Sequence, residues 1–347
     1  MLESLEIENF RGIKKLKIDN FKNINFFIGN ANTSKTSLLE AIYTGFSRNA
    51  LSFLNLLDAR DIAKDDDAFE ALFYDHNSDN TIKINSLIDN EFFELEISSD
   101  YKDYDKLTVS INNIEAVNKL NYLVYKIKNK KGYDTSINRI EEKNDYKFEF
   151  KVLNKKEENI QIKKHDVEFI SVFHYTMSIL FILKAIFADN EKRNILKNIC
   201  RQFDSKINDI IFVDDRLMIE IKDLKHTINI KNMGQGFQKY LTIIASIIYQ
   251  KKYIIIDEIE NGMHFESVKI MLENILSLSK EYGLQFFITT HNKELLEILN
   301  DCLIEKDYKD MLSVYNLYYN KENNIDVINY SQENFSNLIE NNNEMRD

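Results

Sequence analysis

The stretch that decides the fold is FFIGNANTSKTSLLEAIY, residues 26–43. An apolar run ends at Gly29, a short polar segment follows, and apolar residues then recur at helical spacing from Lys35 onward. This order predicts a strand, a loop and a helix. The loop fits the phosphate-binding pattern G-x-x-x-x-G-K-[ST] at Gly29, Lys35 and Thr36. Ser34 occupies the place of the second glycine, so the first question is whether this loop can hold a nucleotide.

Glycine is expected in that place because it adopts positive φ angles and lets a phosphate approach the backbone closely. A residue with a Cβ at positive φ costs about 1–2 kcal/mol, or roughly tenfold to thirtyfold in affinity if all of it appears in binding. Ser34 is therefore a handicap for the loop and does not disqualify it. From the loop alone, a nucleotide site and a chance Lys-Thr helix start are equally good interpretations.

A second segment, YIIIDEIENGMH, places Asp257 and Glu258 at the end of an apolar strand. Beside a phosphate site, one carboxylate would bind Mg²⁺ and the other would orient or deprotonate the attacking water. The alternative is that the strand ends in an acidic turn at the surface without any function. This alternative explains one carboxylate but not the whole set of motif residues. Glu260 is interpreted as a structural residue or as a support of the site.

A third segment, QFFITTHNKE, ends another apolar strand with Thr289, Thr290 and His291. A lone histidine is more often a surface residue or a satisfied core residue. Open α/β sheets, however, bind their ligands at the carboxyl ends of their strands. His291 is therefore a candidate to sense the γ-phosphate or to hold the attacking water.

A fourth segment, NMGQGFQ, places Gly234 and Gly236 directly before a predicted helix. The N-terminus of a helix is favourable for anions, because its first N–H groups lack intrahelical partners. The chain has only 8 glycines and no proline, a skew that we attribute to AT-rich coding. Two glycines that flank a single residue are therefore unlikely to occur here by chance, and they indicate a second anion-binding site.

Taken together, the four motifs resemble those of the ABC-type ATPase heads of the RecF, SMC and OLD (overcoming-lysogenisation-defect) families. LESLEIENFRGI is similar to their N-terminal strand, GNANTSKTSLLEAI to the Walker A region and MGQGFQKYL to the signature region. IIIDEIENGMH is similar to the Walker B region, and TTH to the switch histidine. The resemblance covers residues 1–46 and 166–299, and it is loose between them.

The resemblance implies an α/β fold, an ABC-type P-loop ATPase head with a mixed sheet and a β-rich insertion. It also implies ATP and Mg²⁺ as cofactors, sandwiched between two protomers. Lys35 would contact the β- and γ-phosphates, and Glu258 and His291 would be catalytic. The Mg²⁺ ligands would be Thr36 and Asp257. The nucleotide-binding residues implied in this way are Arg11, Gly29, Asn30, Ala31, Asn32, Thr33, Ser34, Lys35, Thr36 and Ser37, with Gly234, Gln235 and Gly236 meeting the ATP of the second protomer.

We expect three segments along the chain. Residues 1–49 would carry the N-terminal part of the core with the Walker A motif, and residues 50–165 a β-rich insertion. Residues 166–347 would carry a helical segment and the rest of the core. Strands are predicted at LESLEIENF, KKLKIDNF, INFFIG, TIKINSLI, EFFELEIS, KLTVSI, YKFEFKVL, NIQIKK, DIIFVD, LMIEIK, HTINIK, YIIIDE, QFFITTH, MLSVYNLYY and NIDVINYS. Helices are predicted from Lys35, at DAFEALFY, from Asp166 to about Phe203, from Lys239, from Glu266 and after His291.

The composition points to a cytoplasmic protein without a membrane span, since the N-terminus is not a signal peptide and the longest apolar run carries His and Lys. Two cysteines without an export signal favour a reducing compartment. The net charge of −11 argues against strong non-specific binding of nucleic acid by the whole chain. Lysine clusters at residues 14–17 and 126–131 are interpreted as solvated faces, with a local DNA contact as the alternative.

For the cellular role, the compact head without coiled-coil arms or a Toprim domain resembles ATPase subunits of bacterial anti-phage systems such as PARIS and Septu. This resemblance implies a homodimer or higher oligomer that holds or releases a separate effector. One alternative is a RecF-like DNA repair ATPase, whose DNA affinity would fall with rising salt. The other is a nucleotide-binding scaffold with little hydrolysis. The sequence leaves the effector and the trigger open.

Overall fold

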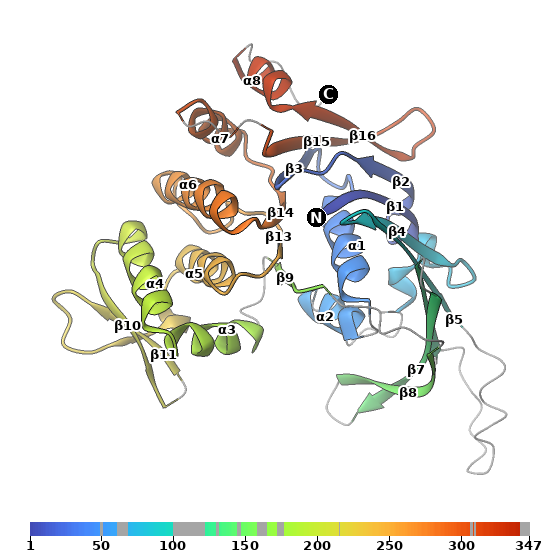
Figure 1. The fold of residues 1–347 in the computed structure, drawn as a ribbon, viewed down its shortest axis with the longest axis horizontal. Helices are drawn as coiled ribbons and strands as arrows, with labels where there is room; N and C mark the ends of the chain where they lie inside the picture. Colours follow the sequence, from blue (N-terminus) through green and yellow to red (C-terminus); the bar gives the residue numbers. More distant parts are fainter. Residues whose placement is uncertain are drawn as a thin grey trace. The chain divides into compact units, whose positions relative to one another are not determined.

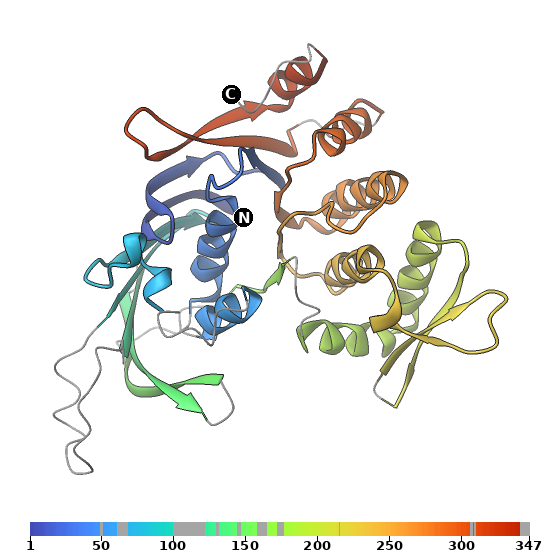
Figure 2. The same ribbon diagram turned by 180° about the vertical axis from the view of Figure 1, so that it is seen from behind.

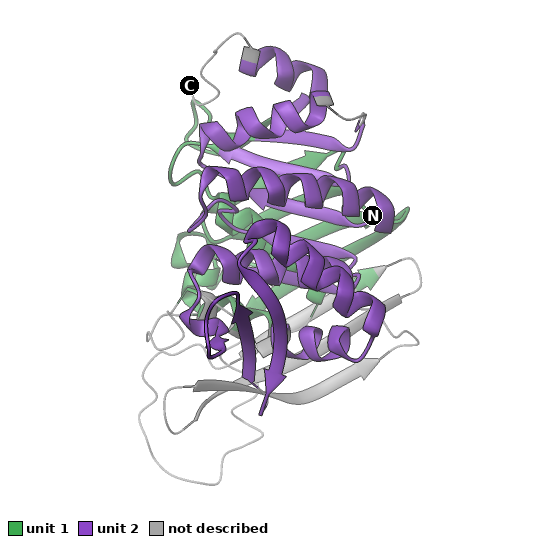
Figure 3. Ribbon diagram, turned by 90° about the vertical axis from the view of Figure 1, so that its left-hand side faces the viewer, with its two compact units in different colours: residues 1–21, 29–165, 316–328 green, residues 22–28, 166–315, 329–347 purple. Residues whose placement is uncertain are grey.

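The computed structural model describes residues 1–48, 51–60, 69–99, 122–129, 132–143, 147–157, 165–171, 177–214, 216–305, 308 and 310–340. They form two compact units (Figure 3). Unit 1 contains residues 1–21, 29–165 and 316–328, and unit 2 contains residues 22–28, 166–315 and 329–347. Each unit thus combines segments from both ends of the sequence. The expected division into three consecutive segments stays a prediction.

Unit 1 is built on an antiparallel sheet in the order β2-β1-β4-β5-β6-β7-β8. Its strands are β1 (Leu2–Phe10), β2 (Ile13–Asp19), β4 (Ile82–Ile88), β5 (Glu91–Ser99), β6 (Tyr122–Asn129), β7 (Gly132–Lys143) and β8 (Lys147–Glu157). Side chains of β4 alternate between buried and half-buried, as expected for a sheet with one face on a core. Helix α1 (Lys35–Ser47) packs on β1 and β4 and covers that core face.

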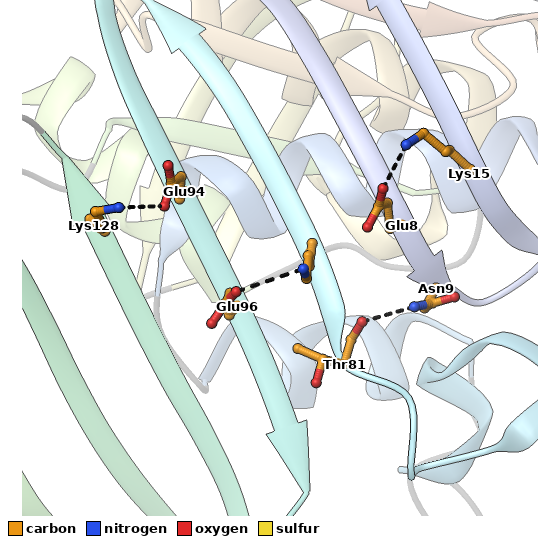
Figure 4. A network of polar contacts seen from close by, with 8 residues as sticks. Glu8, Asn9, Lys15, Thr81, Glu94, Glu96 and Lys128 are labelled. Atoms are coloured by element: carbon orange, nitrogen blue, oxygen red, sulfur yellow. Dashed lines mark hydrogen bonds and ion pairs between the residues drawn. The ribbon is translucent and has the colours of Figure 1, made fainter.

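The other face of this sheet carries charged side chains paired across neighbouring strands (Figure 4). Lys15 Nζ lies 2.8 Å from Glu8 Oε1, and Lys128 Nζ lies 3.2 Å from Glu94 Oε2. Both lysine side chains are well exposed. Such cross-strand pairs between directly opposed residues stabilise a sheet modestly. These two lysines of the predicted clusters therefore lie on a solvated face next to compensating carboxylates.

The second sheet has the order β16-β15-β3-β14-β13-β9. Strands β3 (Ile24–Gly29), β14 (Gln285–Thr289), β13 (Tyr253–Ile256) and β9 (Val167–Ile170) are parallel, and the first three are buried along their whole length. Continuous apolar runs are typical of parallel strands covered on both faces. β15 (Leu312–Tyr319) and β16 (Ile325–Ser331) complete the sheet. The mixed α/β fold class predicted from the sequence is confirmed.

Helices α5 (Gln235–Ile248), α6 (Phe265–Tyr282), α7 (Lys293–Glu305) and α8 (Gln332–Glu340) lie in a row, each packed against the next, beside the parallel strands (Figure 1, Figure 2). Helices α3 (Met177–Phe187) and α4 (Asn190–Phe203) pack on α5. A small antiparallel sheet follows them, made of β10 (Ile207–Val213), β11 (Arg216–Ile221) and β12 (Ile228–Asn229). Among the helices of the described residues, none is long and apolar enough to span a bilayer.

Several local predictions are wrong. The helix expected at DAFEALFY is replaced, within its described part, by the short 3-10 turns Glu70–Leu72 and Tyr74–His76, because Phe73 between them is extended. The segment from Asp166 begins with β9 and becomes helical at Met177. Helix α5 begins at Gln235, four residues before the expected start, and α8 was missed. The strands predicted at KLTVSI and NIQIKK lie outside the described residues.

Candidate functional site

The phosphate-loop candidate, residues 29–37, joins β3 to α1 through three residues with positive φ angles. They are Gly29 at 134°, Asn32 at 64° and Ser34 at 57°. Backbone turned in this way lets successive N–H groups converge on one point, as in anion-binding nests. Ser34 therefore has a left-handed backbone, a conformation that glycine adopts more easily. It is the N-cap residue of α1, which begins at Lys35.

The Ser34 hydroxyl accepts no hydrogen bond from the first turn of α1. An N-cap serine usually has an extended backbone and caps the N–H group of the second or third helical residue. The left-handed backbone of Ser34 directs the side chain elsewhere, so this side chain does not occupy the helix N-terminus. The first N–H groups of α1 are thus not satisfied by their N-cap side chain, which suits an anion site.

Lys35 lies inside the loop and is only 4% exposed. Its Nζ donates to the carbonyl oxygens of Gly29, at 3.0 Å, and Asn30, at 2.6 Å, and to Thr33 Oγ1, at 3.1 Å. These contacts hold the ammonium group against the backbone of the loop. A positive charge held beside the N-terminus of α1 is an arrangement that favours phosphate oxygens.

The end of β15 braces the same loop. A Cβ atom on Gly29 would lie 2.2 Å from the carbonyl oxygen of Leu317, which is a steric clash. Glycine is therefore required at this position both by the clash and by the positive φ angle. The Tyr319 hydroxyl donates to the carbonyl of Asn32 at 2.9 Å. Both contacts are between residues nearly 290 positions apart, and the sequence carries no local signal for them.

Arg11, a predicted nucleotide contact, lies in a buried cluster with α1. Its Nε is 2.5 Å from Glu40 Oε2, and Arg60 Nε is 2.6 Å from Glu40 Oε1. Burial lowers the pKa of Arg11 to about 10, and Glu40 opposes this effect by favouring the charged form. Arg11 Nη2 is buried without a hydrogen-bond partner among the described residues. The structure thus anchors one side of the guanidinium and leaves a donor on the other.

In unit 2, the acidic strand end of β13 is tied to the end of β14. Ile256 pairs with Ile288, so the residues that follow the two strands are neighbours. Thr289 Oγ1 donates to Asp257 Oδ1 at 2.6 Å and accepts from the Glu258 N–H group at 2.8 Å. One hydroxyl therefore orients both predicted carboxylate residues. Glu258 has a φ of 47°, a strained conformation that recurs at functional positions.

Helix α5, which carries the signature candidates, is joined to this acidic strand end by Lys239. Its Nζ donates to the carbonyl oxygens of Asp257, at 2.8 Å, and Glu258, at 2.5 Å. Burial lowers the pKa of Lys239 to about 8, although Asp257, Glu260 and Glu258 favour its charged form. Lys239 was not predicted from the sequence. A lysine in an otherwise apolar helix stretch was the available signal.

The signature glycines differ in their surroundings. A Cβ atom on Gly236 would lie 2.2 Å from the carbonyl oxygen of Gly262, so glycine is needed there for close packing of α5 on the turn after β13. A Cβ atom on Gly234 would meet nothing within 4 Å. Gly234 and Gln235 are exposed at the N-terminus of α5. Packing therefore explains Gly236 but gives no reason for Gly234.

His291 follows β14 and is exposed. Its backbone N–H group donates to Glu260 Oε1 at 2.9 Å. Glu260 thus fixes the segment that carries the histidine, in line with a supporting role for this carboxylate.

Within each unit, the predicted residues form a group. The loop residues 29–37 come together in unit 1. Asp257, Glu258, His291 and the N-terminus of α5 are linked in unit 2 by Thr289, Lys239 and Glu260. The donor set fits the implied ligands. The loop offers N–H groups and an ammonium for a triphosphate, and the Thr36 hydroxyl and the Asp257 carboxylate are the hard oxygen ligands that Mg²⁺ prefers.

The fold is that of an ABC-type P-loop ATPase head. Among solved structures, the Smc head domain of Pyrococcus furiosus, with an extended coiled coil and bound to the C-terminal domain of ScpA, has a TM-score of 0.52 at 10% identity, over 99% of this chain and 100% of that one. At this identity the likeness shows the fold alone. The chain belongs to the family described as "AAA domain, putative AbiEii toxin, Type IV TA system", which matches residues 24–297.

Two curated relatives add to this assignment. Over 340 residues the chain is 27% identical to the ATP/GTP phosphatase of Helicobacter pylori, which covers 91% of this chain and 92% of that protein. A segment of 42 residues is 52% identical to the DNA replication and repair protein RecF of Lactobacillus acidophilus, over 12% of this chain and 11% of RecF.

The contacts of Lys239 lead to a prediction about stability. Lys239→Met is expected to lower the free energy of unfolding by about 1–3 kcal/mol, because the Asp257 carbonyl loses its donor and three carboxylates lose a nearby cation. Chemical denaturation measures this change. Lys231→Met, at an exposed lysine in the 3-10 turn Ile230–Asn232 before α5, is the matched control and should change stability by less than about 0.5 kcal/mol. Equal effects of the two substitutions would contradict the role given to Lys239.

Proposed function

We propose that the chain binds ATP with Mg²⁺ and hydrolyses it, and that nucleotide-dependent dimerisation controls a separate effector protein in anti-phage defence. The observation that carries the first part is the conformation of residues 29–37. Ser34 is left-handed at the N-cap without capping α1, and Lys35 is fixed inside the loop. The match to an ATP/GTP phosphatase over nearly the whole chain supports the same reaction.

In this proposal the Walker A, switch and Walker B segments serve the same nucleotide. The parallel arrangement of β3, β14 and β13 supports it, because the Walker A, switch and Walker B segments each follow the carboxyl end of one of these strands. Lys35 and the N–H groups of residues 30–37 would bind the phosphates, and Thr36 and Asp257 would hold Mg²⁺. When bound, Mg²⁺ would neutralise charge that develops on the transferred phosphoryl group.

Glu258 would act as the general base, and His291 would orient the attacking water or sense the γ-phosphate. Thr289 supports this assignment, because its hydroxyl holds the Glu258 backbone and the Asp257 carboxylate in one geometry. Arg11 would use its unpaired Nη2 as a further donor to the nucleotide.

The experiment that tests nucleotide binding compares wild type with Ser34→Gly. The substitution removes a Cβ atom at positive φ, which costs about 1–2 kcal/mol, and lets a phosphate approach the loop backbone more closely. We expect Ser34→Gly to bind ATP with equal or up to about tenfold higher affinity. Isothermal titration with ATP and Mg²⁺ measures both proteins. Negligible binding by wild type and variant alike would contradict the proposal.

The second part of the proposal concerns partners. The exposed Gly234 and Gln235 at the N-terminus of α5 are available to meet ATP bound to a second protomer, and their exposure supports a dimer. The P. furiosus Smc head was solved with bound ScpA, which supports a separate partner protein for a head of this fold. ATP-dependent closure would then change the surface offered to that partner.

A RecF-like role on DNA is the second candidate, favoured by the short RecF match. The cross-strand pairs of Lys15 with Glu8 and of Lys128 with Glu94 weigh against it, because these lysines lie beside carboxylates that would repel phosphates. Its distinguishing property is DNA binding that weakens steeply with salt. We therefore rank it below effector control.

A further inference from the structure

Gly12 lies in the turn between β1 and β2, directly opposite Ser34. A Cβ atom on Gly12 would be 2.5 Å from Ser34 Oγ and 3.7 Å from Ser34 Cβ. Apart from its chain neighbours, no other described atom lies within 4 Å of that position. Gly12 is also absent from the residues with positive φ, so its backbone conformation is open to other amino acids. The Ser34 side chain is therefore the steric obstacle to a side chain at position 12.

The location of the Ser34 hydroxyl matters for the loop. Ser34 is held in the left-handed conformation and cannot cap α1. With its Oγ against Gly12, the hydroxyl lies on the side of the β1–β2 turn. A side chain at position 12 would force χ1 of Ser34 into another staggered well, about 120° away, or displace the loop backbone. Either change would disturb the residue next to Lys35.

We propose that Gly12 is a positioning residue for the phosphate loop: its missing side chain makes room for the serine that stands in place of the second loop glycine. The glycine missing at position 34 is thus compensated by a glycine at position 12, 22 positions earlier in the chain. This inference rests on the proposed nucleotide site for its functional meaning. Its steric part stands on the contact between residues 12 and 34 alone.

The test is a double-mutant cycle of wild type, Gly12→Ala, Ser34→Gly and the double variant. Gly12→Ala is expected to lower ATP affinity roughly tenfold, and to lower the thermal midpoint without nucleotide by about 2 °C. In the Ser34→Gly background the same substitution should change affinity by less than about twofold, because the obstacle is gone. Lys14→Ala, at an exposed residue of β2, is the control and should leave both quantities unchanged.

Each outcome decides the inference. Rescue of Gly12→Ala by Ser34→Gly supports it, and so does a double variant that folds where Gly12→Ala alone does not. Equal losses in both backgrounds overturn it, as does a double variant that fails to fold like the single one. If wild type binds no ATP, the proposed function fails, while the thermal midpoints of the four proteins still decide whether residues 12 and 34 are coupled.

Discussion

Glu258→Gln is expected to lower the rate of ATP hydrolysis by about 100-fold or more, the usual contribution of a general base. ATP affinity should stay within about threefold of wild type, because glutamine keeps the size of the side chain and loses only its basicity. The backbone N–H group that donates to Thr289 Oγ1 is unaffected, so the strand end keeps its geometry. Slow hydrolysis should also trap the ATP-bound dimer.

Three measurements check this prediction: phosphate release at steady state, ATP affinity at equilibrium and molar mass by light scattering with and without ATP. Glu281→Gln, at an exposed carboxylate near the end of α6, changes the net charge equally and should behave as wild type. Turnover that is unchanged by Glu258→Gln, at an already negligible rate, would favour the scaffold interpretation over an ATPase.

Lys35→Ala is expected to lower ATP affinity by about 100-fold or more, since charge-assisted bonds to phosphate are worth about 1.5–3 kcal/mol each. The same variant should be less stable without nucleotide. The carbonyl oxygens of Gly29 and Asn30 lose their buried donor, which costs about 1–3 kcal/mol. Lysine at this position thus serves both the ligand and the loop.

Titration with ATP and Mg²⁺ and thermal unfolding without nucleotide separate the two effects. Lys14→Ala removes the same charge from an exposed site and is the control for net charge. A Lys35→Ala variant that keeps the affinity of wild type would show that residues 29–37 do not bind the triphosphate. It would then leave the stability effect as the only role of this lysine.

The sequence by itself determined those strands and helices whose hydrophobic pattern reflects the burial of one continuous segment. β1, β3 and α1 have the expected positions to within a residue, because alternation, a continuous apolar run and helical spacing each reflect burial along one segment. The sequence also singled out position 34, where the loop pattern expects glycine, and the structure gives Ser34 a positive φ there. The candidate residues 29–37, 257, 258 and 291 were also predicted from local patterns, and their roles stay predictions.

Only the tertiary structure decided the features that depend on distant partners. Pairing on β13 made residues 167–170 a strand inside a segment that reads as helical, because a parallel neighbour supplies its hydrogen bonds. Lys239, Thr289 and Gly12 gained their roles from contacts with residues more than 15 positions away. A one-dimensional pattern records which faces are buried, but it does not record which atoms meet across the fold.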